Sequence, residues 1–192
     1  MSTFSAISPR HFAPASNRPG FPFALACPII APLMPKLNQW AVLAGFIALC
    51  LGVGAVGGWV TAPAVRDWFP TLVKPSWNPP AWVFAPVWTT LYVMMGIAAW
   101  LVWKRDPRFS GVRLALFLFF VQLALNCLWS FLFFGARAPG LALVDIVALF
   151  VVLGLTVAAF FPHSKPAGFL LLPYLAWVGF AIALNASIWW LN

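Results

Sequence analysis

Residues 74–88 read KPSWNPPAWVFAPVW, and this proline-rich stretch separates two long apolar runs. Proline fixes its own φ and pushes the residue before it toward extended geometry, so Pro75, Pro79 and Pro80 exclude a helix around Trp77. Pro79 and Pro80 are expected in the first turn of the next helix, where proline is tolerated best. The stretch therefore predicts a stiff loop that leads directly into a membrane-length helix.

Three tryptophans, Trp77, Trp82 and Trp88, lie close to this junction. Tryptophan is enriched where a membrane meets water, so the three indoles can act as interfacial anchors. A rigid loop lined with tryptophan beside a membrane span is also typical of the lid and mouth of a binding site. Both interpretations remain open at this point.

The composition defines the class of protein. Hydrophobic residues make up 64% of the chain and charged residues only 7%, with no glutamate. A soluble domain needs roughly 25–35% charged residues on its surface, so we expect an integral membrane protein. The formal charge of +8 is spread between apolar runs rather than gathered on one stripe. It therefore predicts membrane topology, and we expect no nucleic-acid partner.

Five apolar runs are each close to the roughly 20 residues needed to cross hydrocarbon. They cover residues 38–60, 81–103, 114–134, 141–161 and 169–191. The loops between them are short, which favours antiparallel neighbours. We therefore predict an all-α integral membrane protein in which residues 37–192 form a compact bundle of five transmembrane helices.

Residues 1–36 differ from the rest, because they are rich in Ser, Pro and Ala and contain no acid. This bias is typical of an organelle transit peptide, although the prolines oppose a continuous amphipathic helix. Met34 directly precedes the first apolar run, so a mis-assigned start codon explains the same facts. We predict a disordered extension and leave its origin open.

The positive charges predict an orientation. Eight of them fall on the side of the N-terminus and three on the side of the proline-rich loop. The first group is Arg10, Arg18, Lys36, Lys104, Arg105, Arg108, Arg113 and Lys165, and the second is Arg66, Lys74 and Arg137. By the positive-inside rule the N-terminus is cytoplasmic and the loop faces away from the cytosol. The host membrane, a bacterial cell envelope or an organelle membrane, is not resolved.

Small residues recur at helical spacing in the first and last spans. Gly54 and Gly58 form a GxxxG pair, and Gly179, Ala183 and Ser187 repeat the spacing near the end of the chain. Such faces let another helix approach closely. The partner helix can belong to the same bundle or to a second copy of the chain.

Polar residues inside the spans are few, and in a membrane such residues normally face the bundle interior. They are Gln122, Asn126, Ser130, Asp145 and Asn185. The first three are spaced i, i+4, i+8 and form one stripe beside Trp129. An interhelical hydrogen-bond seam explains the stripe. At 1.5 Å per residue, however, most of these groups and Trp88 fall in the half of the bundle beneath the loop, which favours a ligand pocket.

Cysteine and histidine offer little chemistry. Cys50 and Cys127 lie inside apolar runs, where cysteine behaves as a small hydrophobe. With Cys27 the chain has three cysteines, an odd number that cannot all form pairs. His11 and His163 lie outside the runs. We therefore expect no disulfide, no metal site and no axial ligand for a haem iron. The sequence also lacks a recognisable catalytic acid–base pair or activated nucleophile.

Seven short motifs carry a resemblance that covers about residues 37–192. They are WF at 68–69, KPSWNPP at 74–80, PVWT at 86–89, QLALN at 122–126, FFGAR at 133–137, ALVD at 142–145 and PYLAW at 173–177. In order and spacing they resemble the translocator protein family, also called tryptophan-rich sensory proteins or peripheral-type benzodiazepine receptors. The resemblance implies a five-helix bundle, usually dimeric, with a pocket closed by the first loop. It also implies porphyrin ligands and, in animals, cholesterol and drug-like ligands.

Carried over by motif, the resemblance assigns the pocket to eight positions, and the polar stripe adds Gln122. The predicted ligand-binding residues are Phe69, Trp77, Trp88, Gln122, Asn126, Trp129, Asp145, Trp177 and Asn185. Two departures stand out. Phe69 occupies a position where family members often have tyrosine. The family's cholesterol-recognition stretch is replaced by residues 185–190, NASIWW, which weakens the case for a sterol ligand.

The function that follows is a membrane-embedded binder, and sensor or transporter, of tetrapyrroles such as protoporphyrin IX or haem. The macrocycle is expected to stack on tryptophan, and Asn126 or the mouth residues Arg66 and Lys74 to meet its propionates. No cofactor is required, and we expect membrane lipid around a homodimer. The alternative, also implied by the resemblance, is an enzyme that degrades porphyrin with light and oxygen.

Overall fold

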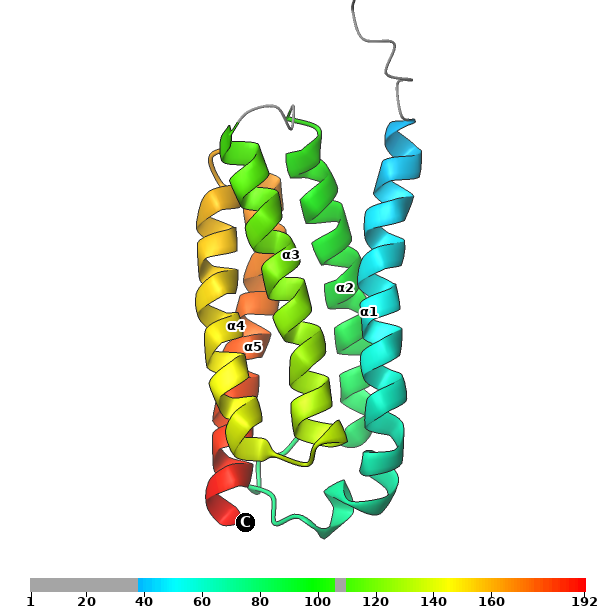
Figure 1. Ribbon diagram of the computed structural model, residues 1–192, viewed down its shortest axis with the longest axis vertical. Coiled ribbons are helices and arrows are strands. Elements are labelled where there is room, and N and C mark those ends of the chain that lie inside the picture. The colour runs from blue at the N-terminus through cyan, green and yellow to red at the C-terminus, as the bar shows by residue number, and fades with distance from the viewer. Residues whose placement is uncertain (1–37, 106–109) are drawn as a thin grey trace, which may run out of the picture. The chain divides into compact units, whose positions relative to one another are not determined.

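The computed structural model describes residues 38–105 and 110–192, so the extension predicted for residues 1–36 lies outside the described residues. Five long helices form the bundle (Figure 1). They are α1 (Gln39–Asp67), α2 (Ala81–Trp103), α3 (Ser110–Ser130), α4 (Pro139–Phe160) and α5 (Lys165–Leu191). All five are long and apolar enough to cross a membrane. The predicted five-span bundle is confirmed, and the chain is a multi-pass integral membrane protein.

The helices pack in a ring of neighbours. α1 contacts α2 and α3, α2 also contacts α5, and α4 lies between α3 and α5. Two glycines set the close crossing of α1 and α2. A Cβ on Gly96 would lie 2.8 Å from the Cα of Ile47, and one on Gly54 would collide with the ring of Tyr92. The absence of a side chain is therefore what lets these two helices touch.

Three predicted spans are too short, the third because it begins at Ser110 rather than at residue 114. The first continues to Asp67 rather than ending at residue 60, because the apolar run extends past Pro63 inside the helix. The fifth begins at Lys165 rather than 169. The Ser164 side chain accepts a hydrogen bond from the Ala167 N–H at 3.4 Å, and a proline follows in the first turn. Serine at this position and proline just inside it are favourable starts for a helix.

The proline-rich loop is non-helical from residue 72 to residue 80, as predicted, after a short 3₁₀ turn at Phe69–Thr71. The prediction that Pro79 and Pro80 lie in the first turn of α2 is wrong. α2 begins at Ala81, and Pro80 precedes it with φ −57° and ψ 142°. The extended ψ of Pro80 keeps it outside the helix, so both prolines belong to the loop.

The end of α3 is a feature that the sequence did not predict. The helix continues as a π-helical segment, η2 (Phe131–Gly135), in which the Ala136 N–H donates to the Phe131 carbonyl at 2.7 Å. Arg137 follows with φ 52°, a left-handed conformation that reverses the chain toward α4. Single π turns inside long helices often mark functional sites.

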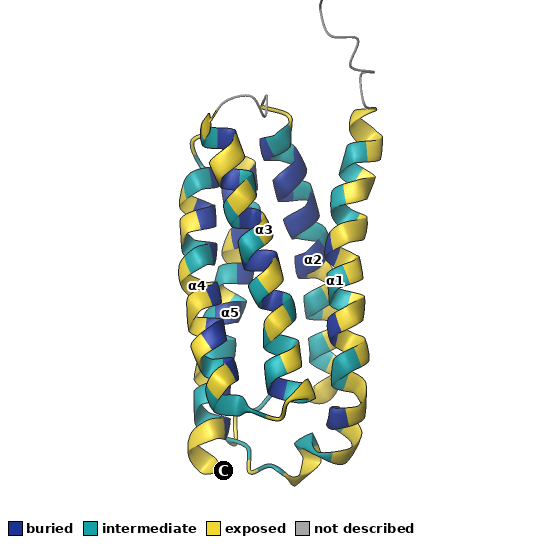
Figure 2. Ribbon diagram, viewed as in Figure 1, coloured by how far each residue is buried: buried dark blue, intermediate teal, exposed yellow. Residues whose placement is uncertain are grey.

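The two halves of the bundle are packed differently. In α2, the buried residues all lie between Leu91 and Val102, and no residue from Ala81 to Thr90 is buried (Figure 2). The main hydrophobic core surrounds the segment of α2 from Leu91 to Val102. Met95, Phe119 and Tyr174 are among its members. The half of the bundle near the proline-rich loop is therefore the place where space remains for a ligand.

Candidate ligand-binding site

A cavity of about 580 Å³ occupies the half of the bundle near the loop. Its walls come from α1, α2, α3, η2 and α5, and from Phe69, Asn78 and Pro79 at the loop end. α4 contributes no lining residue. The volume falls in the range of about 300–1,000 Å³ that is usual for sites holding small molecules.

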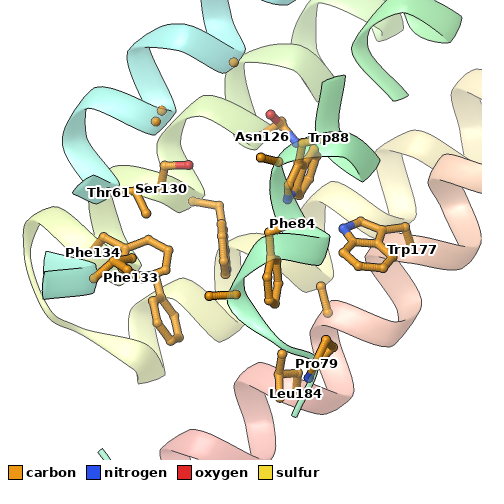
Figure 3. Close-up of a pocket in the computed structure, with 18 of the residues that line it drawn as sticks. Thr61, Pro79, Phe84, Trp88, Asn126, Ser130, Phe133, Phe134, Trp177 and Leu184 are labelled. Atoms are coloured by element: carbon orange, nitrogen blue, oxygen red, sulfur yellow. The ribbon is translucent and has the colours of Figure 1, made fainter. Parts of the chain in front are cut away.

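Nine aromatic side chains line the cavity. Figure 3 shows Phe84, Trp88 and Trp177 gathered on one side, with Phe133 and Phe134 on the opposite side of the view. The rings support one another. Trp177 lies edge-on to Phe84, with ring centroids 5.9 Å apart and an interplanar angle of 73°. The π turn places Phe133 and Phe134 side by side, 4.8 Å apart.

Trp129 completes the aromatic wall from α3. It stacks on Phe133 at 5.2 Å and 27°. Its indole N–H donates to the amide oxygen of Asn185 at 3.0 Å, and the Asn185 amide N–H₂ donates to the Pro139 carbonyl at 2.8 Å. Asn185 thus joins α3, α4 and α5 while it lines the cavity.

Asn126 has two roles in this structure, because it lines the cavity and joins three helices. Its amide oxygen accepts a hydrogen bond from the Tyr92 hydroxyl at 2.6 Å. Its amide N–H₂ donates to the Tyr174 hydroxyl at 3.0 Å. Trp88 stacks on Tyr92 at 5.6 Å and 30°, next to the same tyrosine pair. Asn126 therefore belongs both to an interhelical hydrogen-bond seam and to the wall of the cavity.

Six of the nine predicted ligand-binding residues line the cavity. They are Phe69, Trp88, Asn126, Trp129, Trp177 and Asn185. Four of the five helices contribute to the wall. Three of these four carry residues that were predicted to bind a ligand. That any of the six binds a ligand stays a prediction.

Trp77 lies one layer outside the wall. Its side chain is 46% exposed, and its ring meets the cavity residue Phe180 edge-on at 5.6 Å. In this position Trp77 backs a ring that faces the cavity, and its exposed edge still fits an interfacial anchor.

Gln122 and Asp145 are buried away from the cavity. The Gln122 amide N–H₂ lies 3.9 Å from the Met95 sulfur, and its oxygen has no hydrogen-bond partner among the described residues. The same holds for one Asp145 carboxyl oxygen. Asp145 does not serve the free N–H groups of its own helix. α4 begins at Pro139, so Asp145 is the seventh residue and beyond the first four free N–H groups.

The two predicted mouth cations make local contacts instead. The Arg66 guanidinium donates to the Ala62 carbonyl at 3.3 Å. The Lys74 ammonium donates to the Leu72 carbonyl at 2.8 Å and lies 5.0 Å from the ring centre of Phe69. Neither lines the cavity, and no charged side chain does so among the described residues.

Sequence reasoning missed part of the wall. Tyr92 follows Trp88 by one helical turn, so its position on the same face was available as a signal. Phe133 and Phe134 belong to a quoted motif, but their position depends on the π turn, which has no sequence signature. The contribution of α1 to the wall could not be predicted, because Gly57, Gly58 and the other small residues of its wall carry no side chain that indicates a binding site.

These features define a class of protein, a five-helix membrane bundle with an aromatic cavity under a proline-rich loop. Residues 46–191 match the model of the TspO/MBR family. The chain is 48% identical over 155 residues to the tryptophan-rich protein TspO of Chlorobaculum tepidum, covering 81% of this chain and 98% of that protein. It is 42% identical over 152 residues to the translocator protein of Homo sapiens, covering 78% and 89% of the two chains. It is 38% identical over 154 residues to the tryptophan-rich sensory protein of Cereibacter sphaeroides, covering 80% and 93%.

The chain belongs to the TspO/MBR family, as its motifs predict. Family membership agrees with the five-span fold and places the chain among membrane proteins named for sensing and translocation.

Proposed function

We propose that the protein binds a tetrapyrrole in the aromatic cavity and acts as a membrane sensor or transporter of it. The observation that carries this proposal is the wall itself. A space of about 580 Å³ is lined by nine aromatic rings together with small and aliphatic residues and, among the described residues, by no charged side chain. Flat apolar ligands gain most from such walls, because aromatic faces bury large areas and stack at low entropic cost.

The polar edge of the ligand faces the loop in this proposal. The Asn126 amide already bonds two tyrosine hydroxyls, so it is poorly placed to take a propionate as well. Lys74 is the better candidate, because its ammonium lies over Phe69, a residue of the cavity wall. An ammonium held only by loop carbonyls can exchange one of them for a carboxylate and gain a charge-assisted bond.

Titration of the purified protein with protoporphyrin IX tests the proposal. Trp88, Trp129 and Trp177 line the cavity, so binding there quenches their fluorescence in a saturable way. Trp190, which is 85% exposed and does not line the cavity, offers the control. Trp190→Phe should leave the midpoint unchanged, whereas Trp88→Phe should reduce the amplitude. Quenching that rises linearly and never saturates would remove the proposal. Competition by an uncharged sterol or drug-like compound in the same assay defines how wide the ligand class is.

A second function is favoured by one contact. Trp88 stacks on Tyr92, and both rings line the cavity, so two oxidisable rings adjoin the ligand space, with Tyr174 edge-on to Trp88 at 6.1 Å behind them. Such rings can donate electrons to a photoexcited porphyrin, which suits light- and oxygen-dependent degradation. Loss of porphyrin absorbance over several turnovers under light, absent in the dark, separates this enzyme from a binder.

A further inference from the structure

The cavity wall is incomplete on one side, between α1 and α2. Six residues both line the cavity and have exposed side chains or backbone. They are Leu51, Ala55 and Gly58 on α1, and Ala81, Ala85 and Thr89 on α2. On each helix the three residues follow one another at helical spacing, so they form two facing edges. We call the opening between these edges the lateral slot.

The slot lies beside the contact between Gly54 and Tyr92 and continues past it, where the close crossing of α1 and α2 ends. Gly54 packs against the Tyr92 ring, but one turn further on, no atom lies within 4 Å of the place a Cβ of Gly58 would occupy. Near the loop, α1 is supported instead by the end of α3. A Cβ on Gly57 would lie 3.0 Å from the Ser130 hydroxyl, and one on Gly135 would lie 3.2 Å from Val60. The slot therefore forms because the end of α1 near the loop packs against the end of α3 instead of against α2.

The edges of the slot suit hydrocarbon. The Thr89 hydroxyl donates to the Ala85 carbonyl at 2.8 Å, so the one polar side chain of the α2 edge is satisfied within its own helix. Trp59 and Trp82, 79% and 74% exposed, lie on the outer surface of the same two helices. From Ala81 to Thr89 the α2 edge is about 12 Å long at the helical rise of 1.5 Å per residue.

The loop end of the cavity is tied down. Asn192 pairs with the backbone of Val73, accepting its N–H at 3.0 Å and donating to its carbonyl at 3.0 Å. The Asn192 amide also donates to the Ile188 carbonyl of α5 at 2.8 Å. We call these Asn192 hydrogen bonds the clasp. Phe69, Asn78 and Pro79 of the loop region line the cavity at the same end of the bundle. Passage toward water at this end requires the clasp to break.

We propose that ligands exchange between the cavity and the hydrocarbon of the bilayer through the lateral slot, without passing through water. The site then selects for molecules that are already dissolved in the membrane. This inference rests on the proposed function and adds to it the route by which the ligand enters and the need for the ligand to partition into lipid. The ligand's apolar body enters between α1 and α2, and its charged groups stay at the level of the membrane surface near the loop.

Exchange kinetics in vesicles test this route. Protoporphyrin IX is dissolved in the bilayer of vesicles that carry the protein, and binding and release are followed by tryptophan quenching. Ala85→Trp places a large ring at the slot edge. We expect the dissociation rate to fall by roughly tenfold and the association rate to fall at least as much. Ala55→Phe, which narrows the slot from α1, should act in the same direction.

Matched variants distinguish slot from cavity and from loop. Ala148→Trp makes the same change on an exposed position of α4, which lines no cavity, and should leave both rates unchanged. A side chain that only fills the cavity speeds dissociation, whereas one that blocks the slot slows it. Asn192→Ala releases the clasp and should leave association unaltered.

The proposal is overturned if Ala85→Trp and Ala55→Phe exchange ligand as fast as the unmodified protein or release it faster. It is overturned equally if Asn192→Ala alone accelerates exchange. If the unmodified protein binds no protoporphyrin, the proposed function fails, and N-phenyl-1-naphthylamine dissolved in the bilayer replaces it as the probe. Slowing of that uncharged dye by both slot variants supports the route, and failure of the dye to enter the unmodified protein contradicts it.

Discussion

At the scale of single residues, the polar groups of the site hold the bundle together before they meet any ligand. Asn126 bonds Tyr92 of α2 and Tyr174 of α5, and Asn185 bonds Trp129 and Pro139. The spacing of polar residues predicted where these amides gather. Their partners could not be predicted, because a tyrosine hydroxyl far along the chain has no sequence link to Asn126. Asp145, which both the polar pattern and the motifs predicted in the pocket, does not line the cavity.

Replacing Asn126 by leucine tests this stitching role. The change removes two interhelical hydrogen bonds, and each is worth about 0.6 kcal/mol on average in a membrane bundle, with a maximum near 1.7. We expect the free energy of unfolding in detergent to fall by about 1–2 kcal/mol. Tyr174→Phe removes only one of the two bonds and should cost about half as much. Unchanged stability of Asn126→Leu would mean that these bonds contribute nothing, and Asn126 would then be free to serve a ligand.

At the scale of elements, the geometry of α1 decides how the cavity is walled. The five spans could be predicted because runs of about 20 apolar residues have few alternatives in a membrane. The π segment after α3 and the extra two turns of α1 could not, because neither has a pattern of its own. The small residues of α1 were expected to pack, and Gly54 does so, whereas Gly45 and Gly52 face open space in the single chain.

The two kinds of glycine should respond differently to substitution. Gly96→Val pushes a side chain against the backbone of Ile47, where a Cβ would lie 2.8 Å from the Cα. Overpacking of this kind typically costs about 1–3 kcal/mol, so thermal stability should fall. Gly52→Ala meets no atom within 4 Å and should be neutral or stabilising by up to about 1 kcal/mol, because alanine favours a helix. Equal effects of the two changes would mean that the α1–α2 crossing is not as close as described.

At the scale of the whole bundle, one half is a packed core and the other half is a container. The core cluster around Met95, Phe119 and Tyr174 fills the half far from the loop. The aromatic cavity takes the other half, and it is bounded by the loop and by the lateral slot. The cytoplasmic N-terminus and the homodimer remain predictions. The exposed stripe of Ala41, Gly45, Ala48 and Gly52 on α1 is a face that a second copy could occupy.

The central claim is that the cavity itself receives the tetrapyrrole, and the most direct test is to fill it. Ala181 lines the cavity from α5, whereas Ala183 lies two residues further along on the exposed face of the same helix. The measurement is the dissociation constant for protoporphyrin IX of Ala181→Trp and Ala183→Trp, each compared with the unmodified protein. We expect Ala181→Trp to lose roughly tenfold or more in affinity, equal to about 1.4 kcal/mol, and Ala183→Trp to lose none. Equal affinity of the two variants would place the ligand outside the cavity and contradict the account.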